Sequence, residues 1–262
     1  MRALSRLSLS VLLALLLLFG PTLKAAGTLL ASVKVAGTTA AATTAAIDAT
    51  GATAFLGCVI ERTPQSVVLT DSEGSTWNSL TSQSDDGNDH VTTIYWSNPS
   101  SVSATHTFTA TSSDWVGHLY MTAWSGVIVN PFDQQNGVVQ TASSTVQPGS
   151  ITPTNPNQIV LTCSTNDNTT NSIDGGFTLL LTDPLGTSYG GALSYLIQTT
   201  AAAANPTTTF SGLTTSTAVI GSFKTESSGP AGIKTYNGVA SASVKTIIGI
   251  AIASIKSWLG IT

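Results

Sequence analysis

Charge is the property that this chain has least of. Among its 262 residues, Lys and Arg number 9 and Asp and Glu 13, so that 8% are charged, whereas a typical soluble domain has about 25%. No Lys or Arg lies between Arg62 and Lys224, an interval that contains ten carboxylates. Proteins that bind the phosphates of DNA or RNA need clustered basic side chains. The sequence therefore excludes sequence-independent binding of nucleic acid by this region.

Long apolar runs are also scarce. The run near the N-terminus, Leu7–Phe19, follows Arg2 and Arg6 and is shorter than the roughly 20 apolar residues of a membrane helix. A positive start, a short apolar stretch and the small pair Ala25–Ala26 are typical of a secretory signal peptide. We predict that residues 1–26 are such a signal, with a retained N-terminal anchor as the alternative. The mature protein is then secreted and has no integral membrane span.

Hydroxyl side chains are abundant, with 33 Ser and 42 Thr. Disorder is excluded because 42% of the residues are hydrophobic and the mean hydropathy is +0.26, which leaves ample apolar surface to bury. From residue 27 to residue 226, short β-branched and aromatic runs alternate with Gly, Pro, Asn and Asp, and no window predicts an amphipathic helix of three turns.

This pattern predicts an all-β domain, an antiparallel β-sandwich of jelly-roll type over residues 27–226. Thr favours strands and keeps their outer face wet, which explains solubility with so little charge. The expected strands are 53–61, 67–70, 91–96, 106–111, 117–124, 158–163, 177–181, 192–198, 207–210 and 218–224.

Eight short motifs follow one another along this body. They are Asp71-Ser-Glu-Gly-Ser-Thr-Trp77, Asn98-Pro99 with His106-Thr-Phe108, Trp124-Ser-Gly126, Pro131-Phe-Asp-Gln-Gln-Asn-Gly137, Gly149-Ser-Ile-Thr-Pro153, Asp174-Gly-Gly-Phe177, Leu193-Ser-Tyr-Leu-Ile-Gln198 and Ser222-Phe-Lys224. In order and spacing, residues 45–225 resemble a family of secreted or phage-encoded β-sandwich modules of environmental bacterial and phage proteins. The resemblance implies a sandwich fold, and it carries over no established catalytic residues.

The end of the chain repeats with a period of eleven residues. Ile233–Ser243 is followed by a second copy, Val244–Ser254, and by a truncated third copy, Ile255–Thr262. Several residue types keep the period, which is a strong repeat signal. Residues 227–232 are expected to link the sandwich to this tail, residues 233–262. The residues that recur are Lys234, Lys245 and Lys256, and Gly238, Gly249 and Gly260.

Two conformations are compatible with the tail. An eleven-residue period suits a right-handed helical supercoil, whereas a Gly in every copy and many β-branched residues weaken a helix. We favour short strands that stack by repetition, and a membrane-surface amphipathic segment is a further alternative. The tail also resembles the Lys-Thr-x-x-Gly tracts of phage tail-fibre-like and other virion-associated proteins, which implies a role in linking or assembly.

One motif of nucleophilic catalysis occurs, Gly186-Thr-Ser-Tyr-Gly190, which matches G-x-S-x-G. In an α/β-hydrolase a helix follows this motif and the catalytic His comes later in the chain. Here a strand-like run follows, and His90, His106 and His118 all precede Ser188. Nearly all acidic residues lie in turn sequences typical of solvated groups, which disfavours the carboxylate pair of a glycosidase. We predict that the protein is not an enzyme and has no cofactor.

Metal binding has one candidate loop. The histidines lack the spacing of a zinc site and are expected to be ordinary half-buried or surface residues. Oxygen ligands are densest in Asp85-Asp-Gly-Asn-Asp89, and Ca²⁺ prefers such flexible oxygen-rich loops, although the EF-hand pattern is absent. Asp85, Asp86 and Asp89 are therefore candidate calcium ligands, with a solvated turn as the alternative.

Two further pairs of residues are candidates for specific roles. Cys58 and Cys163 are the two cysteines; export permits a disulfide between them, but each also lies in an apolar run where Cys serves as a small hydrophobic residue. Trp115, next to Asp114 in a turn, is the best candidate for stacking on a sugar ring. The other aromatic residues are expected to build the core.

These features predict a non-catalytic secreted structural or assembly protein at a surface, in a matrix or on a virion. Its C-terminal repeats would mediate self-association or attachment, helped by attraction between an acidic body and a tail with evenly spaced lysines. The alternative is a carbohydrate-binding or adhesin-like module that binds a cell-surface or glycan partner through an aromatic and acidic loop edge.

Overall fold

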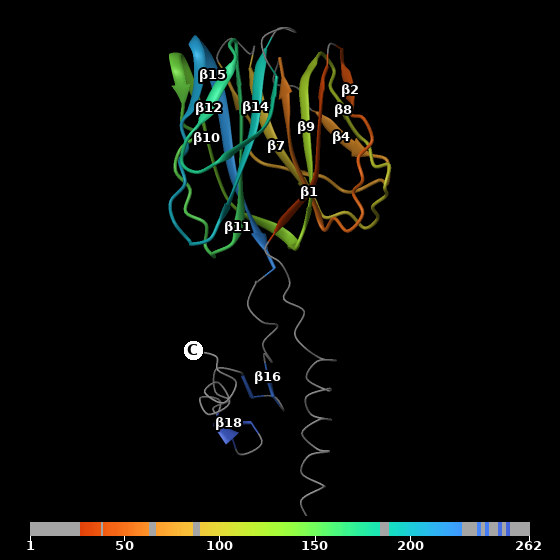
Figure 1. Ribbon diagram of the computed structural model, residues 1–262. Coiled ribbons are helices and arrows are strands. Elements are labelled where there is room, and N and C mark those ends of the chain that lie inside the picture. Colours follow the sequence, from red (N-terminus) through yellow and green to blue (C-terminus); the bar gives the residue numbers. More distant parts are fainter. Residues whose placement is uncertain are drawn as a thin grey trace, which may run out of the picture. The chain divides into compact units, whose positions relative to one another are not determined.

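The computed structural model of the chain describes residues 27–37, 39–62, 67–85, 90–183 and 189–226, and the backbone of four two-residue strands beyond them. Contacts group residues 25–227 into one compact unit. Its described residues form strands and no helix (Figure 1), which confirms the predicted all-β class. The expected signal peptide, residues 1–26, and the linker, residues 227–232, lie outside the described residues.

Three antiparallel sheets build this unit. The middle sheet has the order β1-β9-β3-β7-β5, with β6 also on β7, and the second sheet has the order β10-β15-β11-β14-β13, with β12 also on β15. A small third sheet has the order β2-β8-β4. The strands of the middle sheet are β1 Thr28–Ala36, β3 Ala54–Glu61, β5 Asn78–Ser79, β6 Gln83–Ser84, β7 Val91–Ser97 and β9 Val116–Ser125. Those of the second sheet are β10 Val127–Val146, β11 Gln158–Asn166, β12 Thr170–Ile173, β13 Thr178–Asp183, β14 Gly190–Gln198 and β15 Thr208–Thr225. Those of the third sheet are β2 Ala41–Thr43, β4 Val68–Asp71 and β8 Phe108–Thr111.

Two hydrophobic cores lie on the two faces of the middle sheet. The first core packs against the second sheet and includes Leu56 and Ile60 of β3. The second core packs against the third sheet and includes Phe55 and Val59 of the same strand. Successive side chains of a strand point to opposite faces, so every residue of β3 is buried. Figure 1 shows the layers in this order, with β15 and β14 on the left, β9 and β1 in the middle, and β8 and β4 on the right.

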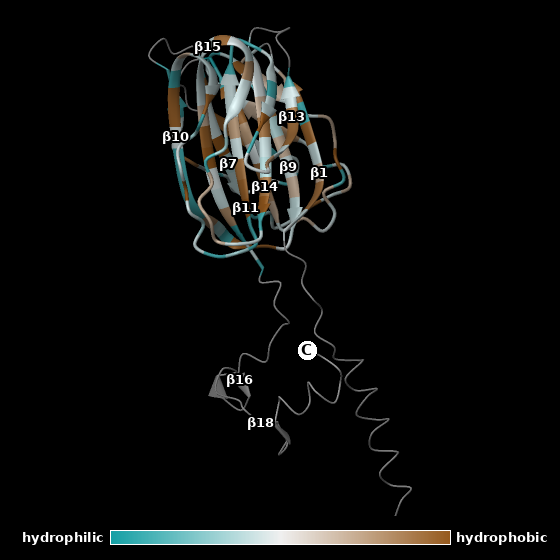
Figure 2. Ribbon diagram, turned by 60° about the vertical axis from the view of Figure 1, so that its left-hand side comes forward, coloured by the Kyte–Doolittle hydropathy of each residue, from teal (hydrophilic) through white to brown (hydrophobic). Residues whose placement is uncertain are grey.

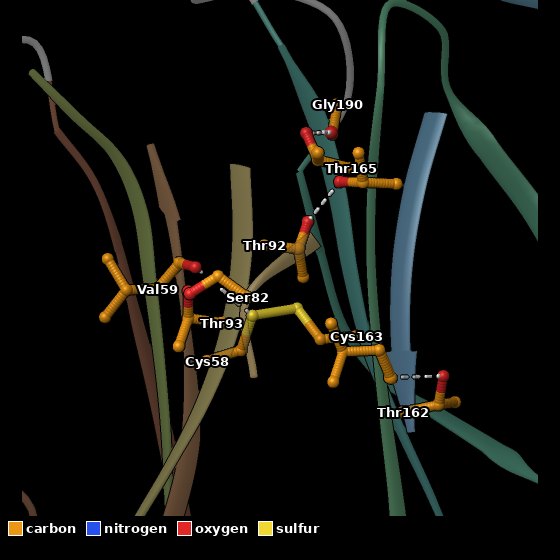
Figure 3. Close-up of a disulfide and its surroundings, with 11 residues drawn as sticks. Cys58, Val59, Ser82, Thr92, Thr93, Thr162, Cys163, Thr165 and Gly190 are labelled. Atoms are coloured by element: carbon orange, nitrogen blue, oxygen red, sulfur yellow. Dashed lines mark hydrogen bonds between the residues drawn. A yellow bond between two sulfur atoms is a disulfide. The ribbon is translucent and has the colours of Figure 1, made fainter. Parts of the chain in front are cut away.

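A disulfide crosses the first core. It joins Cys58 of β3 to Cys163 of β11, whose Cα atoms are 6.4 Å apart, and both residues are fully buried (Figure 3). The sequence left two roles open for these cysteines, a disulfide or two separate small hydrophobic residues, and the structure shows the disulfide. It links the centres of the two larger sheets.

Hydroxyl groups also lie inside, and not only on the wet outer face that the sequence predicted. Thr92 of β7 and Thr217 of β15 are fully buried, and their hydroxyl oxygens are 2.7 Å apart across the first core. Thr165 donates to the carbonyl of Gly190 on the neighbouring strand (Figure 3). Buried hydroxyls are tolerated where they find such partners. Along the strands, hydrophobic segments are therefore interrupted by white and teal ones (Figure 2).

The sequence pair Asn136-Gly137, whose residue types are typical of a turn, lies within β10. Asn136 donates to the carbonyl of Ser150, and Gln134 accepts the backbone N–H of Thr152. Side chains of β10 thus hold the segment that follows the strand against it. Since β10 is the terminal strand of its sheet, these contacts cover part of an edge that would otherwise be open to other strands.

The repeat tail contains four short strands at equivalent positions of two copies. β16 (Thr235–Tyr236) pairs with β17 (Val239–Ala240), and β18 (Thr246–Ile247) pairs with β19 (Ile250–Ala251), all antiparallel. Each pair is separated by two residues, which is the spacing of a β-hairpin. The described backbone therefore has the short strands that we favoured over a helix. The repeated lysines and glycines, and the third copy, lie outside the described residues.

Candidate functional site

Polar and titratable groups gather at one end of the sandwich, opposite the end where β1 begins and β15 ends. We call this the histidine end and define it by Asp85, His90, His118, Asp167, Asp183 and Tyr189. Its residues come from both larger sheets: His118 from β9 and Asp183 from β13, with the others directly beside β6, β7, β11 and β14.

His90 lies between two carboxylates. Its Nδ1 is 3.0 Å from Asp85 Oδ2 and its Nε2 is 2.9 Å from Asp167 Oδ1. His90 is 2% exposed, and its ring meets the ring of Tyr189 edge-on at 4.9 Å. Asp167 is held in turn, because its backbone N–H donates to Thr214 Oγ1. This one side chain therefore connects the middle sheet with the second sheet.

His118 makes a second connection between the same sheets. Its Nε2 donates to the carbonyl of Tyr189 at 2.8 Å, and its Nδ1 is 3.3 Å from Asp183 Oδ2. Lys34 of β1 forms an ion pair with Asp183 at 2.6 Å. Burial opposes ionisation of Asp183, but the hydrogen bonds and charges of His118 and Lys34 outweigh it and lower the pKa of that carboxyl to about 2.

The third histidine lies elsewhere. His106 is fully buried against Phe55 and Phe108 in the second core, and its Nε2 is 3.5 Å from Asp71 Oδ1. Neither ring nitrogen has a hydrogen-bond partner. Asp71 instead accepts N–H groups of its own turn and the Nε1–H of Trp77. The first sequence motif of the body is therefore a turn closed by the carboxylate at its start.

These positions correct two expectations. The histidines were expected to be ordinary half-buried or surface residues, and all three are buried beside a carboxylate. Asp71, Asp85 and Asp183 were expected to be solvated, and each packs against a histidine. The His90 pair with Asp167 is 77 residues apart in sequence. Local sequence chemistry cannot reveal such a contact.

Of the candidate calcium ligands, the structure describes one. Asp85 is 8% exposed and faces His90, while Asp86 and Asp89 lie outside the described residues. Among the residues that are described, no group of three or more His, Cys, Asp or Glu side chains could hold a metal ion. Calcium binding at this loop stays a prediction.

Trp115 lies at the edge of the histidine end. It is half-buried, its ring centroid is 5.2 Å from that of Tyr189, and a Cβ at Gly117 would come within 3.0 Å of it. Asp114 beside it is exposed. The other aromatic residues are in the cores, as expected: Trp124 and Tyr120 are fully buried in the first core.

A second polar cluster lies at the opposite end. Asp133 accepts hydrogen bonds from the backbone and hydroxyl of Thr154 and from Gln158, and Lys224 pairs with it at 3.1 Å. Burial opposes ionisation, yet these donors lower the pKa of Asp133 to about 2. Lys224 also lines a cavity of about 240 Å³ together with Asn155. The cluster ties the start of β10 to β11 and β15.

Glu61 is an acidic residue with no counter-charge among the described side chains. It ends β3, is 2% exposed, and its Oε2 has no hydrogen-bond partner. Burial raises the pKa of its carboxyl to about 8. By strand alternation it lies on the face of β3 that carries Phe55 and Val59. Sequence reasoning missed this residue, because a single Glu at a strand end gives no signal of burial.

The G-x-S-x-G sequence spans residues 186–190, of which 186–188 lie outside the described residues. The strand β14 begins at its last residue, Gly190, so a strand and not a helix follows the motif. In the described part of the chain, no helix has the length and hydropathy needed to cross a bilayer.

Comparison with known protein families, with curated proteins and with solved structures finds no match to this chain.

Proposed function

We propose that this chain is a secreted, non-catalytic structural protein whose C-terminal repeats associate with those of other copies. The observation that carries the proposal is the equivalence of the two tail hairpins, β16–β17 and β18–β19, whose strands occur one repeat period apart. A sequence that repeats one supersecondary unit buries its apolar groups by stacking copies of that unit.

Hairpins of this size need a partner. A single two-stranded hairpin is marginally stable in water, and three or more strands with a hydrophobic face are needed for independent stability. The second copy, Val244–Ser254, contains one charged residue, Lys245, and is rich in Ile. Uncharged β-branched segments with open edges pair readily with other strands. Pairing between copies would supply the missing strands.

The body supports this role by its construction. Its larger sheets are joined by a disulfide, by the Thr92–Thr217 contact and by the two histidines, and its polar side chains serve to hold one element against another. Such a body is a rigid carrier for a tail. The acidic residues of the body and the lysines of the tail add an attraction between copies that salt weakens.

Sedimentation velocity on the mature chain tests the proposal. The full protein is expected to form oligomers that grow with concentration and shrink with salt, and a variant that lacks residues 233–262 is expected to be monomeric. Proline at Tyr236 and Ile247, the equivalent strand residues of the two hairpins, should abolish association, since proline cannot donate to a strand ladder. Proline at Ser243, between the hairpins, is the matched control. Equal masses for the full and truncated proteins would refute the assembly role.

A second candidate function, glycan binding, is favoured by one observation. Trp115 and Tyr189 place their rings 5.2 Å apart at the histidine end, beside the exposed Asp114. Aromatic rings next to carboxylates suit the faces and hydroxyls of sugars. Binding to a glycan array, lost in Trp115→Ala and kept after tail deletion, is the expected result. No binding with or without calcium would remove this candidate.

A further inference from the structure

We propose that the cavity beside Lys224 binds one ring of a neutral sugar through Gln158 and Lys224. The site lies where β10 and β11 begin and β15 ends, at the opposite end of the sandwich from Trp115 and Tyr189. This inference is independent of the assembly role and of the second candidate function, which places a sugar at the histidine end. It depends on one buried side chain whose hydrogen bonds the fold leaves incomplete.

Gln158 is that side chain. It begins β11, is fully buried and lines the cavity. Its Nε2 donates to Asp133 Oδ2 at 2.9 Å, whereas its Oε1 has no hydrogen-bond partner among the described residues. The two amide atoms cannot be exchanged, because the pKa of Asp133 is about 2 and an ionised carboxylate only accepts hydrogen bonds. A buried acceptor is unfavourable without a donor, so Oε1 is suited to a hydroxyl that comes from outside the chain.

Lys224 supplies the complementary group. Its Nζ is 3.1 Å from Asp133 Oδ1, so Asp133 contacts Gln158 with one oxygen and Lys224 with the other. An ammonium group has three N–H donors, and the side chain of Lys224 is 33% exposed, so it can donate to a further oxygen. A hydroxyl both donates and accepts hydrogen bonds. Two neighbouring hydroxyls of a sugar therefore match the acceptor of Gln158 and the donor of Lys224.

The size and charge of the cavity define the class of ligand. Its volume is about 240 Å³, whereas one water requires about 10–15 Å³ and drug-sized ligands occupy about 300–1,000 Å³. A single sugar ring lies between these limits. Lys224 is the charged residue among the described side chains that line the cavity, and Asp133 balances its charge, which favours a neutral ligand over an ion. Ile128 and Pro156 add apolar groups for the carbons of the ring.

The walls of the cavity are held in place by the fold itself. Asp133 accepts hydrogen bonds from the backbone N–H and the hydroxyl of Thr154, which fixes the segment that precedes β11. Thr225 Oγ1 donates to the carbonyl of Asn157, and the backbone N–H of Asn157 donates to the carbonyl of Gln198 at 2.7 Å. A ligand that binds to such walls orders few side chains, which favours its binding.

Saturation-transfer difference NMR on the full protein tests the proposal, with glucose, galactose and mannose as separate probes. We expect transfer to at least one of these sugars, and a loss of affinity of at least about tenfold in Lys224→Met and in Gln158→Met, since each removes one of the two polar contacts. Lys34→Met is the matched control, because Lys34 forms its ion pair with Asp183 in the histidine end, and it should bind as the wild type does. No transfer to any of the three sugars would overturn the proposal.

A crystal structure of the wild type with the best of these sugars locates the ligand, whether or not the variants fold. The expected result is a sugar ring in the cavity with hydroxyl oxygens in hydrogen-bond distance of Gln158 Oε1 and Lys224 Nζ. Waters alone in the cavity, or residues 227–232 of the chain itself, would overturn the proposal. Transfer that is lost in Trp115→Ala and kept in both cavity variants would also overturn it, because the sugar would then bind at the histidine end.

Discussion

The two hydrophobic cores on either side of the middle sheet are held in different ways. The first core is crossed by the Cys58–Cys163 disulfide and by the Thr92–Thr217 contact. The second core has no covalent link between its described residues, and a histidine and a glutamate, His106 and Glu61, are buried on its side of the middle sheet. It is closed by the small third sheet, whose strands have three or four residues.

This difference indicates a division of roles. The first core lies between two large sheets whose strands come from distant parts of the chain. A disulfide there restricts the unfolded chain strongly, because it closes a long loop. The second core depends on packing alone. Substitutions there should therefore lower stability by opening cavities, and buried charge should make that stability depend on pH. Four sets of substitutions separate these two cases, and their expected costs decrease in the order given.

Removal of the disulfide should have the largest effect. We expect Cys58→Ala with Cys163→Ala to lower the free energy of unfolding by about 4–5 kcal/mol, because the bridge closes a loop with a sequence separation of 105 residues. Urea unfolding measures this loss. Wild type treated with a reductant should match the variant, and thiol titration of the unfolded, unreduced protein should find no free thiol. Equal stability of oxidised and reduced wild type would contradict the prediction.

In the second core, Phe108 is the test of packing. It is fully buried and meets Phe55 edge-on at 5.0 Å. Phe108→Ala should cost about 4 kcal/mol, the usual range for a fully buried Phe. Val68→Ala on β4 of the same small sheet is the control, since Val68 is 59% exposed and should cost less than about 0.5 kcal/mol. Similar costs for both variants would mean that the second core adds little.

Glu61 should make stability depend on pH. The pKa of its carboxyl is about 8 in the folded state against 4.5 for a free glutamate side chain, so folding is favoured below pH 4.5 and the benefit is lost as the pH rises toward 8. Glu61→Gln should remove this decline, by a few kcal/mol at most over the range. Urea midpoints at pH 5, 6.5 and 8 measure it. Glu73→Gln, at an exposed position, should keep the decline, and a flat wild-type profile would refute the role of Glu61.

The threonine contact across the first core should have the smallest effect. Thr92→Val should cost about 1–2 kcal/mol because it leaves the Thr217 hydroxyl buried without its partner. The double change with Thr217→Val should be nearly neutral, since two apolar groups of the same shape then face each other. A double-mutant cycle in urea gives the coupling. Additive costs would show that the contact between hydroxyls is unimportant.

The sequence predicted the strands that are bounded by clear turn signals. It missed those whose course depends on pairing with strands distant in sequence. β3 and β7 were placed within a residue or two of their observed bounds. β10 was missed, because Pro131 and Asn136-Gly137 signal turns locally, while in the fold positive backbone angles at Asn130 and Ala142 let a 20-residue strand bend. Two expected strands, 207–210 and 218–224, are parts of one strand, β15.

The sites were less predictable than the fold for the same reason. The disulfide could be proposed, because two cysteines allow one pairing. The histidine end could not, since His90 meets Asp167 and His118 meets Asp183 through strand order, which turn signals do not determine. Glu61 is buried only because a third sheet covers β3, and alternation along one strand cannot predict a second covering layer.

The disulfide also determines how the chain would respond to pulling. In the body, β1 begins and β15 ends at the same end of the sandwich, as the pairings Thr28 with Ser125 and Val127 with Thr225 require. A force applied to the two ends of the body would therefore separate β1 from β9 and β15 from its partner strands, one residue pair at a time. Unravelling would stop at Cys58 and Cys163, which are 105 positions apart in sequence, and the segment between them would carry no load.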